Sequence, residues 1–593
     1  MILDPLVPRP IDLPTRIDGE LETAKIIAAP DDPAEWPQWR ERLAAWRDCA
    51  RAGYSGRLYD RPEFAWTQSC FSVALVWLWD ELLYDFEAER FTPDRLLQEG
   101  RREFGGFDGV VLWHAYPVIG IDDRNQFDWY RDVPGLPDLV ASLHAAGVRV
   151  FVDYNPWDVG TRREPVEDAN AVASIVQWLD ADGVFLDTMK EAPAELRAAI
   201  DAARPGVAFE GESTLPLARI EDHHLSWAQW FADSDVPGVI RARWFEQRHM
   251  LHHTRRWNRD HSDELHSSWL NGTGMLVWDV VFGAWVGWNE RDKGLLRAMA
   301  GVQRRHASLL THGEWTPLAA HSEALEVVGS RWARGGEELW TFVNRTREPF
   351  DGDVGPFRLA IPPRGLAAVE PDGRMTVSAD ASAHFPVRAT VRVPAPRAAA
   401  GEPPPGMVAC PPPPAQAAVF RRRETGTYGA APYVEEWKPL PPRLHDFVEV
   451  ERPAGAARYA ISVNREPLVN VTLDEARAYA AERGARLPTE DEWQAAAGVI
   501  DRGEPRVWEW TESEHRDGRT RFAILKGGSD QVVPGSDWYV DGGDVRPERS
   551  LKLLLVGGGL QRSPSIGFRL AVDLPGKVPD TFEGVRHQLG GLP

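Results

Sequence analysis

The sequence predicts a multidomain fold: a (β/α)8 TIM barrel, an antiparallel β-sandwich and a loop-rich α+β domain. Residues 62 to about 310 alternate short apolar runs with amphipathic stretches, a pattern typical of parallel strands joined by helices. After about residue 318, strand-like runs follow one another through Gly, Pro and Asp turns. The remainder is rich in Gly and Pro. We therefore divide the chain into residues 1–318, 319–400 and 401–593.

The barrel segment contains eight candidate strands separated by helical patterns. They are residues 63–68, 108–114, 148–154, 182–188, 206–212, 225–231, 266–272 and 275–281. Their number and the length of the segment suit a (β/α)8 barrel. A doubly wound open sheet is the alternative, but no G-x-G-x-x-G motif opens a helix in this segment.

The second and third segments have different patterns. Residues 324–332, 338–346, 357–363 and 387–395 read as strands of a small sandwich packed on the barrel. The Pro-rich stretch 394–405 is a predicted linker. The last segment shows one clear helix, at residues 472–484.

Composition limits the class of protein. With 67 Lys and Arg against 89 Asp and Glu, the net charge is −22, which disfavours nucleic acid and anionic membranes as partners. The N-terminus has no signal-peptide pattern, and the longest apolar run is too short to span a bilayer. Three widely spaced cysteines predict neither a disulfide framework nor a cysteine metal site. We expect a soluble, cytoplasmic protein without a cofactor, whose oligomeric state the sequence leaves open.

Acidic residues end successive predicted strands of the barrel. In such barrels the reactive groups lie at the carboxyl ends of the strands. The candidates are Trp113, His114, Asp153, Asn155, Asp187, Glu210 and Glu212, followed by Trp227, Asp233, Asp235 and Asp279. Two carboxylates on neighbouring strands are what glycoside hydrolysis requires. Two other interpretations stay open: Asp153, Asp187 and Glu212 as ligands of a divalent cation, or acids that cap helices or form ion pairs.

Tryptophan favours the sugar interpretation. The chain has 26 Trp against 22 Phe and 11 Tyr, and indole rings stack on the apolar faces of sugars. Tryptophans predicted at or just after strand ends are Trp113, Trp157, Trp227, Trp230, Trp278, Trp285 and Trp288. Polar neighbours that could bind hydroxyl groups are His114, Asn155, Asp158, Gln229 and Asn289. Most tryptophans are simply core residues, but the excess in the barrel segment predicts a carbohydrate site.

Three motifs of the barrel segment resemble those of retaining glycoside hydrolases of the alpha-amylase and alpha-galactosidase type. GVRVFVDYNPW (147–157) is similar to the third-strand motif of alpha-amylases, which maps onto Asp153 and Asn155. DADGVFLDTMKE (180–191) resembles their fourth-strand motif, whose second Asp is the nucleophile; it maps onto Asp187. AFEGES (208–213) resembles the fifth-strand Gly-Glu, which implies that Glu212 is the acid/base.

The chain also departs from this resemblance. The Arg that alpha-amylases carry two residues before the nucleophile is Phe185 here, and the His after the third-strand Asn is Pro156. For the seventh-strand Asp, Asp279 and Asp235 are the candidates. Alpha-galactosidase-type enzymes take their acid from the sixth strand, which would favour Asp233 or Asp235 over Glu212.

A histidine-rich run at residues 243–266 has two interpretations. His249 and His253, four residues apart on a predicted helix, could form a metal-ligand pair. The alternative is a basic, aromatic helix that packs on the barrel.

The third segment resembles the formylglycine-generating-enzyme (sulfatase-modifying factor) superfamily. The resemblance rests on motifs that occur in the right order: PPGMVAC (404–410), RLPTEDEW (486–493), VWEW (507–510), LKGGSD (525–530) and IGFRLA (566–571). It implies a C-type-lectin-like fold. The copper-binding cysteine pair of these enzymes has no counterpart, because the last cysteine is Cys410. We therefore expect a non-catalytic domain that packs on the barrel, shapes the substrate entrance or binds glycan.

These observations predict a hydrolase that cleaves an alpha-glycosidic bond of an oligosaccharide or glycoside by a retaining mechanism. Asp187 would be the nucleophile and Glu212 the acid/base, with Glu210 as substitute. Substrate contacts would come from Trp113, His114, Asp153, Asn155, Trp157, Asp158, Trp227, Gln229, Asp235 and Asp279. One alternative is a metal-dependent oxidase or protein-modifying enzyme that uses the C-terminal domain, and another is a non-catalytic carbohydrate-binding protein.

Overall fold

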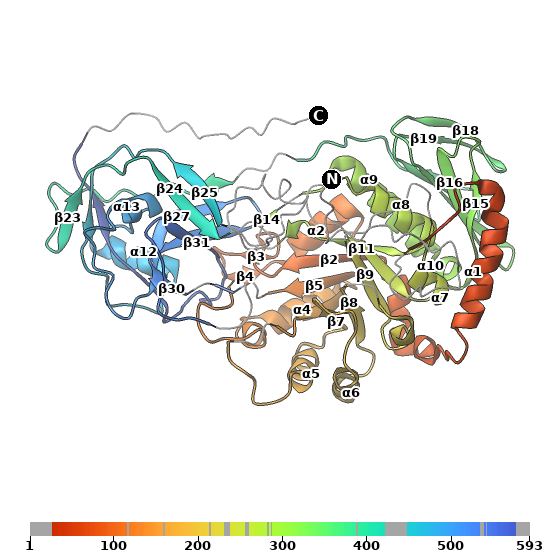
Figure 1. Cartoon of the computed structure of the whole chain (residues 1–593), viewed down its shortest axis with the longest axis horizontal. Helices are drawn as coiled ribbons and strands as arrows, with labels where there is room; N and C mark the ends of the chain where they lie inside the picture. The colour runs from red at the N-terminus through yellow and green to blue at the C-terminus, as the bar shows by residue number, and fades with distance from the viewer. Residues whose placement is uncertain are drawn as a thin grey trace.

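The computed structural model describes twelve stretches of the chain. They are residues 26–114, 118–157, 161–212, 215–229, 238–254, 260–281, 284–285, 287–386, 390–421, 447–533, 539–540 and 542–576. A barrel lies between a β-sandwich (green in Figure 1) and a C-terminal domain (blue).

Eight parallel strands close into a barrel, which confirms the predicted fold class. In chain order they are β2 (Ser72–Trp77), β5 (Gly109–Trp113), β6 (Arg149–Tyr154), β7 (Gly183–Leu186), β8 (Ala208–Gly211), β9 (Leu225–Gln229), β11 (Met250–Thr254) and β12 (Gly274–Val277). Each pairs with the next, and β12 closes the ring on β2. All eight carboxyl ends therefore lie at one rim, called the mouth below.

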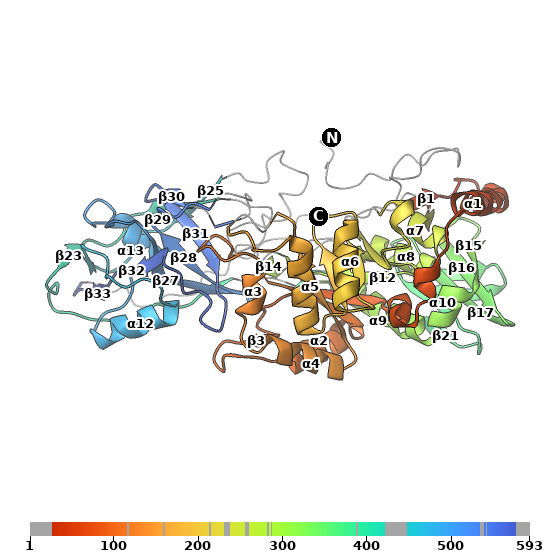
Figure 2. The same ribbon diagram turned by 90° about the horizontal axis from the view of Figure 1, so that it is seen from below.

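Helices surround the barrel (Figure 2). They are α2 (Pro93–Phe104), α3 (Asp128–Arg131), α4 (Leu136–Ala145), α5 (Asp168–Leu179), α6 (Ala194–Ala203), α7 (Arg241–Phe245), α8 (Ser262–Asn271), α9 (Glu290–Arg305) and α10 (Ala307–His312). Helix α2 shows how the sequence sets such bounds: Pro93 begins it, Gly105 ends it at φ 81°, and Leu96, Leu97 and Phe104 form its buried face.

Short elements complete the barrel domain. Helix α1 (Trp36–Ala50) and the 3-10 helices η3 (Arg57–Asp60) and η4 (Pro62–Ser69) precede β2. Strand β1 (Ile26–Ala28) pairs with β10 (Gly238–Ile240), β3 (Tyr84–Asp85) with β4 (Arg90–Phe91), and β13 (Val280–Val281) with β14 (Ala284–Trp285).

Two predicted barrel strands are wrong. Residues 63–68 form η4, which Pro62 begins, and the first barrel strand is β2, inside the run judged too short to cross a membrane. Residues 266–272 belong to helix α8, which Gly272 ends at φ 61°. The missing strand is β11, in the histidine-rich run predicted as a helix. Its five residues are all buried, and its two histidines hide the apolar pattern of an interior strand.

The histidines of β11 are tolerated inside the barrel where they find polar partners. His252 Nδ1 contacts the Glu210 carboxylate from β8, and its Nε2 lies 2.7 Å from the carbonyl oxygen of Cys70. Both side chains are fully buried. Burial alone would lower the pKa of His252, but the charge of Glu210 outweighs burial and raises that pKa above its usual value.

Two antiparallel sheets form the predicted sandwich. One contains β15 (Glu314–His321), β16 (Val327–Arg334), β17 (Glu337–Asn344), β20 (Leu366–Val369) and β21 (Met375–Val377), and the other β18 (Phe350–Val354) and β19 (Phe357–Ile361). Phe342 of one sheet and Leu359 of the other belong to one buried cluster. Of predicted strand 387–395, the described part β22 (Val391–Arg392) pairs with the C-terminal domain instead.

The described part of the C-terminal domain contains two larger sheets and one two-stranded pair. The larger contains β22, β24 (Gln416–Arg421), β25 (Phe447–Arg452), β27 (Trp508–Arg516), β28 (Arg521–Lys526), β31 (Arg549–Leu554) and β32 (Ile566–Phe568). The smaller contains β23 (Met407–Cys410), β26 (Tyr459–Ser462) and β33 (Ala571–Asp573), and β29 (Gly528–Ser529) pairs with β30 (Gly543–Asp544).

Capping boxes define both helices in the described part of this domain. Helix α12 (Leu473–Glu482) is the predicted one, and α13 (Glu490–Ala495) is too short for a periodic signal. In each helix, the hydroxyl of the N-cap Thr accepts a hydrogen bond from the backbone N–H of a Glu three residues later. The carboxylate of that Glu accepts one from the backbone N–H of the Thr. The motif residues Arg486, Trp493, Trp508, Trp510 and Arg569 are buried; Arg569, for example, forms an ion pair with Glu509.

Among the described residues, no helix combines the length and the apolar character needed to cross a bilayer.

The His252–Glu210 pair predicts a pH dependence of stability. Because the pKa of His252 is raised in the folded state, its contribution is complete below the unfolded value of about 6.5 and disappears as pH rises through the folded value. We expect the difference in free energy of unfolding between the wild type and His252→Gln to shrink as pH rises from 5.5 to 9, measured by urea denaturation. His384→Gln, at an exposed histidine, is the control. A difference that does not change with pH would contradict the pairing.

Candidate active site

Two acids predicted to be catalytic follow neighbouring strands at the mouth. Asp187 directly follows β7, and Glu212 directly follows β8. Their backbones are fixed by hydrogen bonds: Asp187 N donates to Tyr154 O at 3.0 Å, and Glu212 N donates to Met189 O at 3.0 Å. Both side chains are largely buried, with 8% of each residue exposed. The barrel therefore holds two carboxylates at adjacent positions of one rim.

Hydrogen bonds connect these acids to the residues beside them. Asn155 Nδ2 donates to Asp187 Oδ2 at 3.3 Å, and Thr188 N donates to Glu212 Oε2. Glu212 thus binds the peptide N–H of the residue that directly follows Asp187. Trp157 Nε1 donates to Thr188 Oγ1 at 3.1 Å, which orients an indole that is 67% exposed. These hydrogen bonds connect four of the predicted site residues into one group: Asn155, Trp157, Asp187 and Glu212.

Thr188 has a strained backbone. Its φ is +61°, in the left-handed region that β-branched residues rarely adopt. Such a conformation costs about 1–3 kcal/mol and persists where surrounding contacts enforce it, often at functional sites. Here the contacts are the Glu212 carboxylate on the Thr188 amide and the Trp157 indole on its hydroxyl. The sequence offers no signal for this residue, because its type is unremarkable for a loop.

Asp153 is a third acid in the same group, on β6. It is 5% exposed, and its Oδ1 has no hydrogen-bond partner among the described residues. Burial, and then the nearby charge of Glu212, raise the pKa of Asp153 well above its usual value. Asp153 therefore keeps its proton to a higher pH than an exposed aspartate does, which limits the negative charge beside Glu212.

A buried layer of polar side chains supports the group. Gln126 accepts from Asn155 N at 3.0 Å and donates to Asn155 O at 2.6 Å. His114 stacks on Tyr130 with ring centroids 3.6 Å apart, and its Nε2 lies 2.8 Å from Gln126 O. Burial lowers the pKa of His114 to about 3, although the contact with Gln126 opposes this, so His114 is neutral. It acts through Gln126 on Asn155; Gln126 and Tyr130 were not predicted.

Glu210 lies apart from this group. Its carboxylate contacts His252, whose other nitrogen faces the carbonyl oxygen of Cys70, two residues before the barrel's first strand begins. Glu210 is fully buried. Its role as a substitute catalyst stays a prediction that no observation tests.

The tryptophans that motivated the sugar interpretation are mostly core residues. Trp113 packs edge-on against Trp77 at 5.3 Å, and Trp227 stacks on Phe185 at 4.1 Å. Trp113, Trp227, Trp278 and Trp288 are at most 4% exposed. Indoles are large enough to fill the barrel interior, which explains most of the excess. Among the described tryptophans of this set, Trp157 is the exposed one, and it lies beside Asp187.

The remaining predicted residues differ in their surroundings. Asp279 follows β12 and forms an ion pair with Arg519 of the C-terminal domain. Gln229 lies in β9, but its side chain is outside the described part of the structure, as are Asp158, Trp230, Asp233 and Asp235 entirely.

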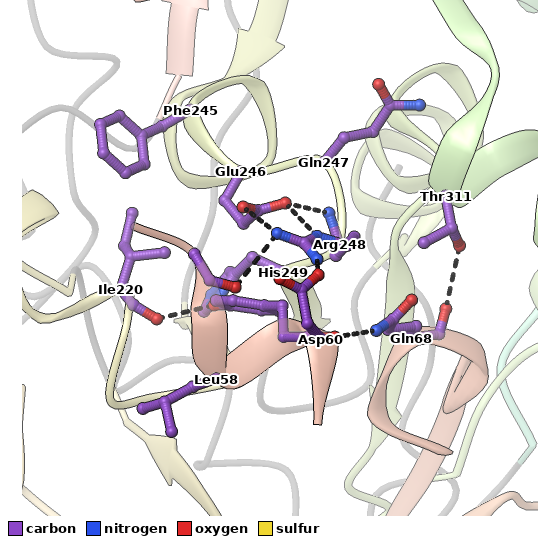
Figure 3. A network of polar contacts seen from close by, with 12 residues as sticks. Leu58, Asp60, Gln68, Ile220, Phe245, Glu246, Gln247, Arg248, His249 and Thr311 are labelled. Atoms are coloured by element: carbon purple, nitrogen blue, oxygen red, sulfur yellow. Dashed lines mark hydrogen bonds and ion pairs between the residues drawn. The ribbon is translucent and has the colours of Figure 1, made fainter. Parts of the chain in front are cut away.

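His249 belongs to a network of polar contacts at the amino end of β11 (Figure 3). It precedes β11, lies 3.0 Å from the Tyr59 hydroxyl and contacts Ser226 Oγ at 2.7 Å. The adjacent Arg248 forms ion pairs with Glu246 and Asp60. The prediction that His249 and His253 lie four residues apart on one helix is therefore wrong, because His253 lies in strand β11. In the described ranges, no group of three or more His, Cys, Asp or Glu side chains is arranged to hold a metal ion.

The raised pKa of Asp153 gives a second pH-dependent prediction. As pH rises above about 3.9, the unfolded state loses this proton before the folded state does, so the wild type loses up to about 1.4 kcal/mol of stability per pH unit. Asp153→Asn removes that loss. We expect the variant to gain stability relative to the wild type between pH 4 and 7 in urea unfolding followed by tryptophan fluorescence. Asp138→Asn, at an exposed acid on α4, should track the wild type. Equal slopes for Asp153→Asn and the wild type would show that Asp153 ionises normally.

Part of the C-terminal domain matches a known domain family. Residues 445–506 match the sulfatase-modifying factor enzyme 1-like domain family. The inactive C-alpha-formylglycine-generating enzyme 2 of Mus musculus is 36% identical over 77 residues, which cover 13% of this chain and 23% of that protein. The chain thus spans under a quarter of that relative's length.

Two solved structures each align with about half of this chain. A cyclic α-maltosyl-(1→6)-maltose hydrolase from Arthrobacter globiformis aligns at 11% identity with a TM-score of 0.34, covering 52% of this chain and 99% of that one. An α-amylase from Geobacillus thermoleovorans aligns at 10% identity with a TM-score of 0.35, covering 53% and 99%. The C-terminal part of the chain therefore contains a sulfatase-modifying-factor-type domain, joined to an eight-stranded parallel barrel.

Proposed function

We propose that the barrel is a glycoside hydrolase that cleaves an alpha-glycosidic bond by a retaining mechanism. The observation that carries the proposal is the contact of the Glu212 carboxylate with the peptide N–H next to Asp187. It fixes two carboxyl-bearing residues side by side at the mouth of a parallel barrel, where such enzymes act. Retaining hydrolysis needs two close carboxyl groups, one as nucleophile and one as acid and base.

Asp187 is the proposed nucleophile. It attacks the anomeric carbon, the leaving oxygen departs, and a covalent glycosyl–Asp187 ester forms. Asn155 Nδ2 orients the Asp187 carboxylate through its hydrogen bond to Oδ2.

Glu212 is the proposed acid and base. It donates a proton to the leaving oxygen and then takes one from the water that hydrolyses the ester, so the proton count balances over the cycle. The Thr188 amide holds the carboxylate in place at Oε2. The raised pKa of Asp153 favours its neutral form, which limits the negative charge beside the pair.

Trp157 is the proposed sugar platform. Its indole is 67% exposed beside Asp187, and the bond from Nε1 to Thr188 fixes its orientation. An aromatic face held in this way offers apolar surface to the C–H face of a sugar.

Replacing the two acids tests the proposal. Asp187→Asn and Glu212→Gln should each lower kcat/KM on aryl α-glycosides by about 10³-fold or more, because each removes a group that reacts in the transition state. Asp138→Asn on α4 is the matched control, since it changes an exposed acid away from the mouth.

Two further measurements separate the roles. Dinitrophenolate leaves a glycoside with little need for protonation by an acid. In the Glu212→Ala variant acting on a dinitrophenyl glycoside, added azide should therefore restore turnover and give the α-glycosyl azide. NMR of the first product should show retained anomeric configuration. Turnover unchanged in Asp187→Asn would overturn the proposal, and binding without turnover in the wild type would favour a carbohydrate-binding protein.

A further inference from the structure

Arg519 links the C-terminal domain to the mouth of the barrel. It lies in the turn between β27 and β28 and reaches two acids that follow neighbouring barrel strands. Its Nη2 lies 2.6 Å from Asp80 Oδ2 after β2, and its Nη1 lies 2.8 Å from Asp279 Oδ2 after β12. Its Nε also donates to both Asp80 oxygens, at 2.8 and 2.9 Å. One guanidinium therefore bridges two strand ends.

The local charges make this contact strong. Asp80 is fully buried and Asp279 half-buried, so without Arg519 two neighbouring carboxylates would repel each other with little water to screen them. Burial alone would lower the pKa of Arg519, but Asp279 and Asp80 outweigh it and raise that pKa. Removing one partner of a buried ion pair is far costlier than losing a surface pair.

The turn that carries Arg519 is itself fixed in shape. Asp517 Oδ1 accepts from the backbone N of Arg519 at 2.9 Å and from that of Thr520. Asp517 Oδ2 also accepts from Trp285 N of the barrel domain at 3.3 Å. Arg519 O in turn accepts from Glu81 N at 2.9 Å. Hydrogen bonds to backbone groups of the turn itself and of the barrel domain therefore fix the turn that carries the guanidinium.

The contact continues along the rim. After β5, Ile119 O accepts from Val540 N at 2.7 Å, and Gly120 lies so close that a Cβ would meet Val540 O at 2.9 Å. After β6, Trp157 O accepts from the Tyr539 hydroxyl at 2.9 Å. Arg124 also donates to Leu560 O at 2.7 Å. These contacts follow β12, β2, β5 and β6, four consecutive strands of the ring.

The two domains also share apolar core. Tyr84 of the barrel domain and Tyr539, Val540 and Leu560 of the C-terminal domain belong to one buried cluster. The arrowheads of β2 and β5 point toward the C-terminal domain in Figure 1. Asp187 and Glu212 follow β7 and β8, the next two strands of the ring.

We infer that the C-terminal domain is a fixed wall of the active site, anchored by Arg519 between Asp80 and Asp279, that restricts the barrel to the end of a sugar chain. The wall consists of residues 517–520, 539–540 and 557–565. This inference rests on the proposed function. A chain that passes through an open barrel mouth must leave on both sides of the catalytic acids, and the wall occupies the mouth over half of its strands. A chain end needs room on one side alone.

Binding to the inactivated chain tests the wall separately from catalysis. In full-length Asp187→Asn protein, we compare linear maltoheptaose with cyclomaltoheptaose, which has the same seven glucose units and no end. We expect the linear sugar to bind at least about tenfold more tightly, which corresponds to about 1.4 kcal/mol, in titrations followed by tryptophan fluorescence. Equal affinities, or no binding of either sugar, would overturn the inference. If the linear sugar is preferred but the parent chain shows no turnover, the proposed catalysis fails and the wall stands.

A variant of the anchor shows whether the wall sets this preference. Arg519→Ala, added to Asp187→Asn, should reduce the preference to below about threefold and increase hydrogen exchange in residues 78–85 and 278–281. Arg506→Ala is the matched control, because Arg506 forms exposed ion pairs within the C-terminal domain. Arg519→Lys keeps the charge and serves if the alanine variant does not fold; it should give an intermediate preference. A preference unchanged in both Arg519 variants would overturn the role of the anchor.

Discussion

Closure of the parallel barrel is the constraint on which the rest of the structure depends. Because β2 and β12 complete the ring, residues distant in sequence meet at one rim. Asp187 and Glu212 become neighbours because β7 and β8 pair in register, with Leu186 opposite Gly211. The same closure places Asp80 and Asp279 side by side, although about 200 residues separate them. One set of main-chain hydrogen bonds thus creates both the acid pair proposed for catalysis and the acid pair that anchors the C-terminal domain.

The sequence predicted the architecture where pattern and burial agree. Strands β5 to β8 are apolar runs ended by polar residues, and helix α12 starts at a capping box, so each carries a local signal. Strand β11 has no such signal, since His252 and His253 replace the expected Val or Ile and depend on tertiary partners such as Glu210. Helix α8 contains a Ser-Ser-Trp-Leu run that reads equally well as a strand. In both cases long-range contacts decide the outcome.

The candidate site divides along the same line. Asn155, Asp187 and Glu212 could be predicted because they follow apolar strands, and Asp153 because it lies near the end of one. The structure brings them together with Trp157. Thr188, Gln126 and Tyr130 could not be predicted, since their importance lies in a backbone angle and in hydrogen bonds that only the folded chain defines. Tryptophan was a weaker guide than its count indicated. A large aromatic side chain suits a barrel interior as well as a sugar platform, and only exposure separates Trp157 from Trp113 and Trp227.

Asp279 shows how the C-terminal domain changes the interpretation of the mouth. From sequence it is a candidate for the acid that binds substrate, but in the folded chain Arg519 already neutralises it. Asp279 would have to break its ion pair with Arg519 before its carboxylate could bind a hydroxyl group of a substrate. That would leave the charges of Asp80 and Arg519 unbalanced in a buried environment. Substrate contacts are therefore favoured on the other side of the ring, around Asp187, Glu212 and Trp157. The net charge of −22 fits this division: acids are plentiful at the rim, and the placement of one arginine decides which of them stay available for chemistry.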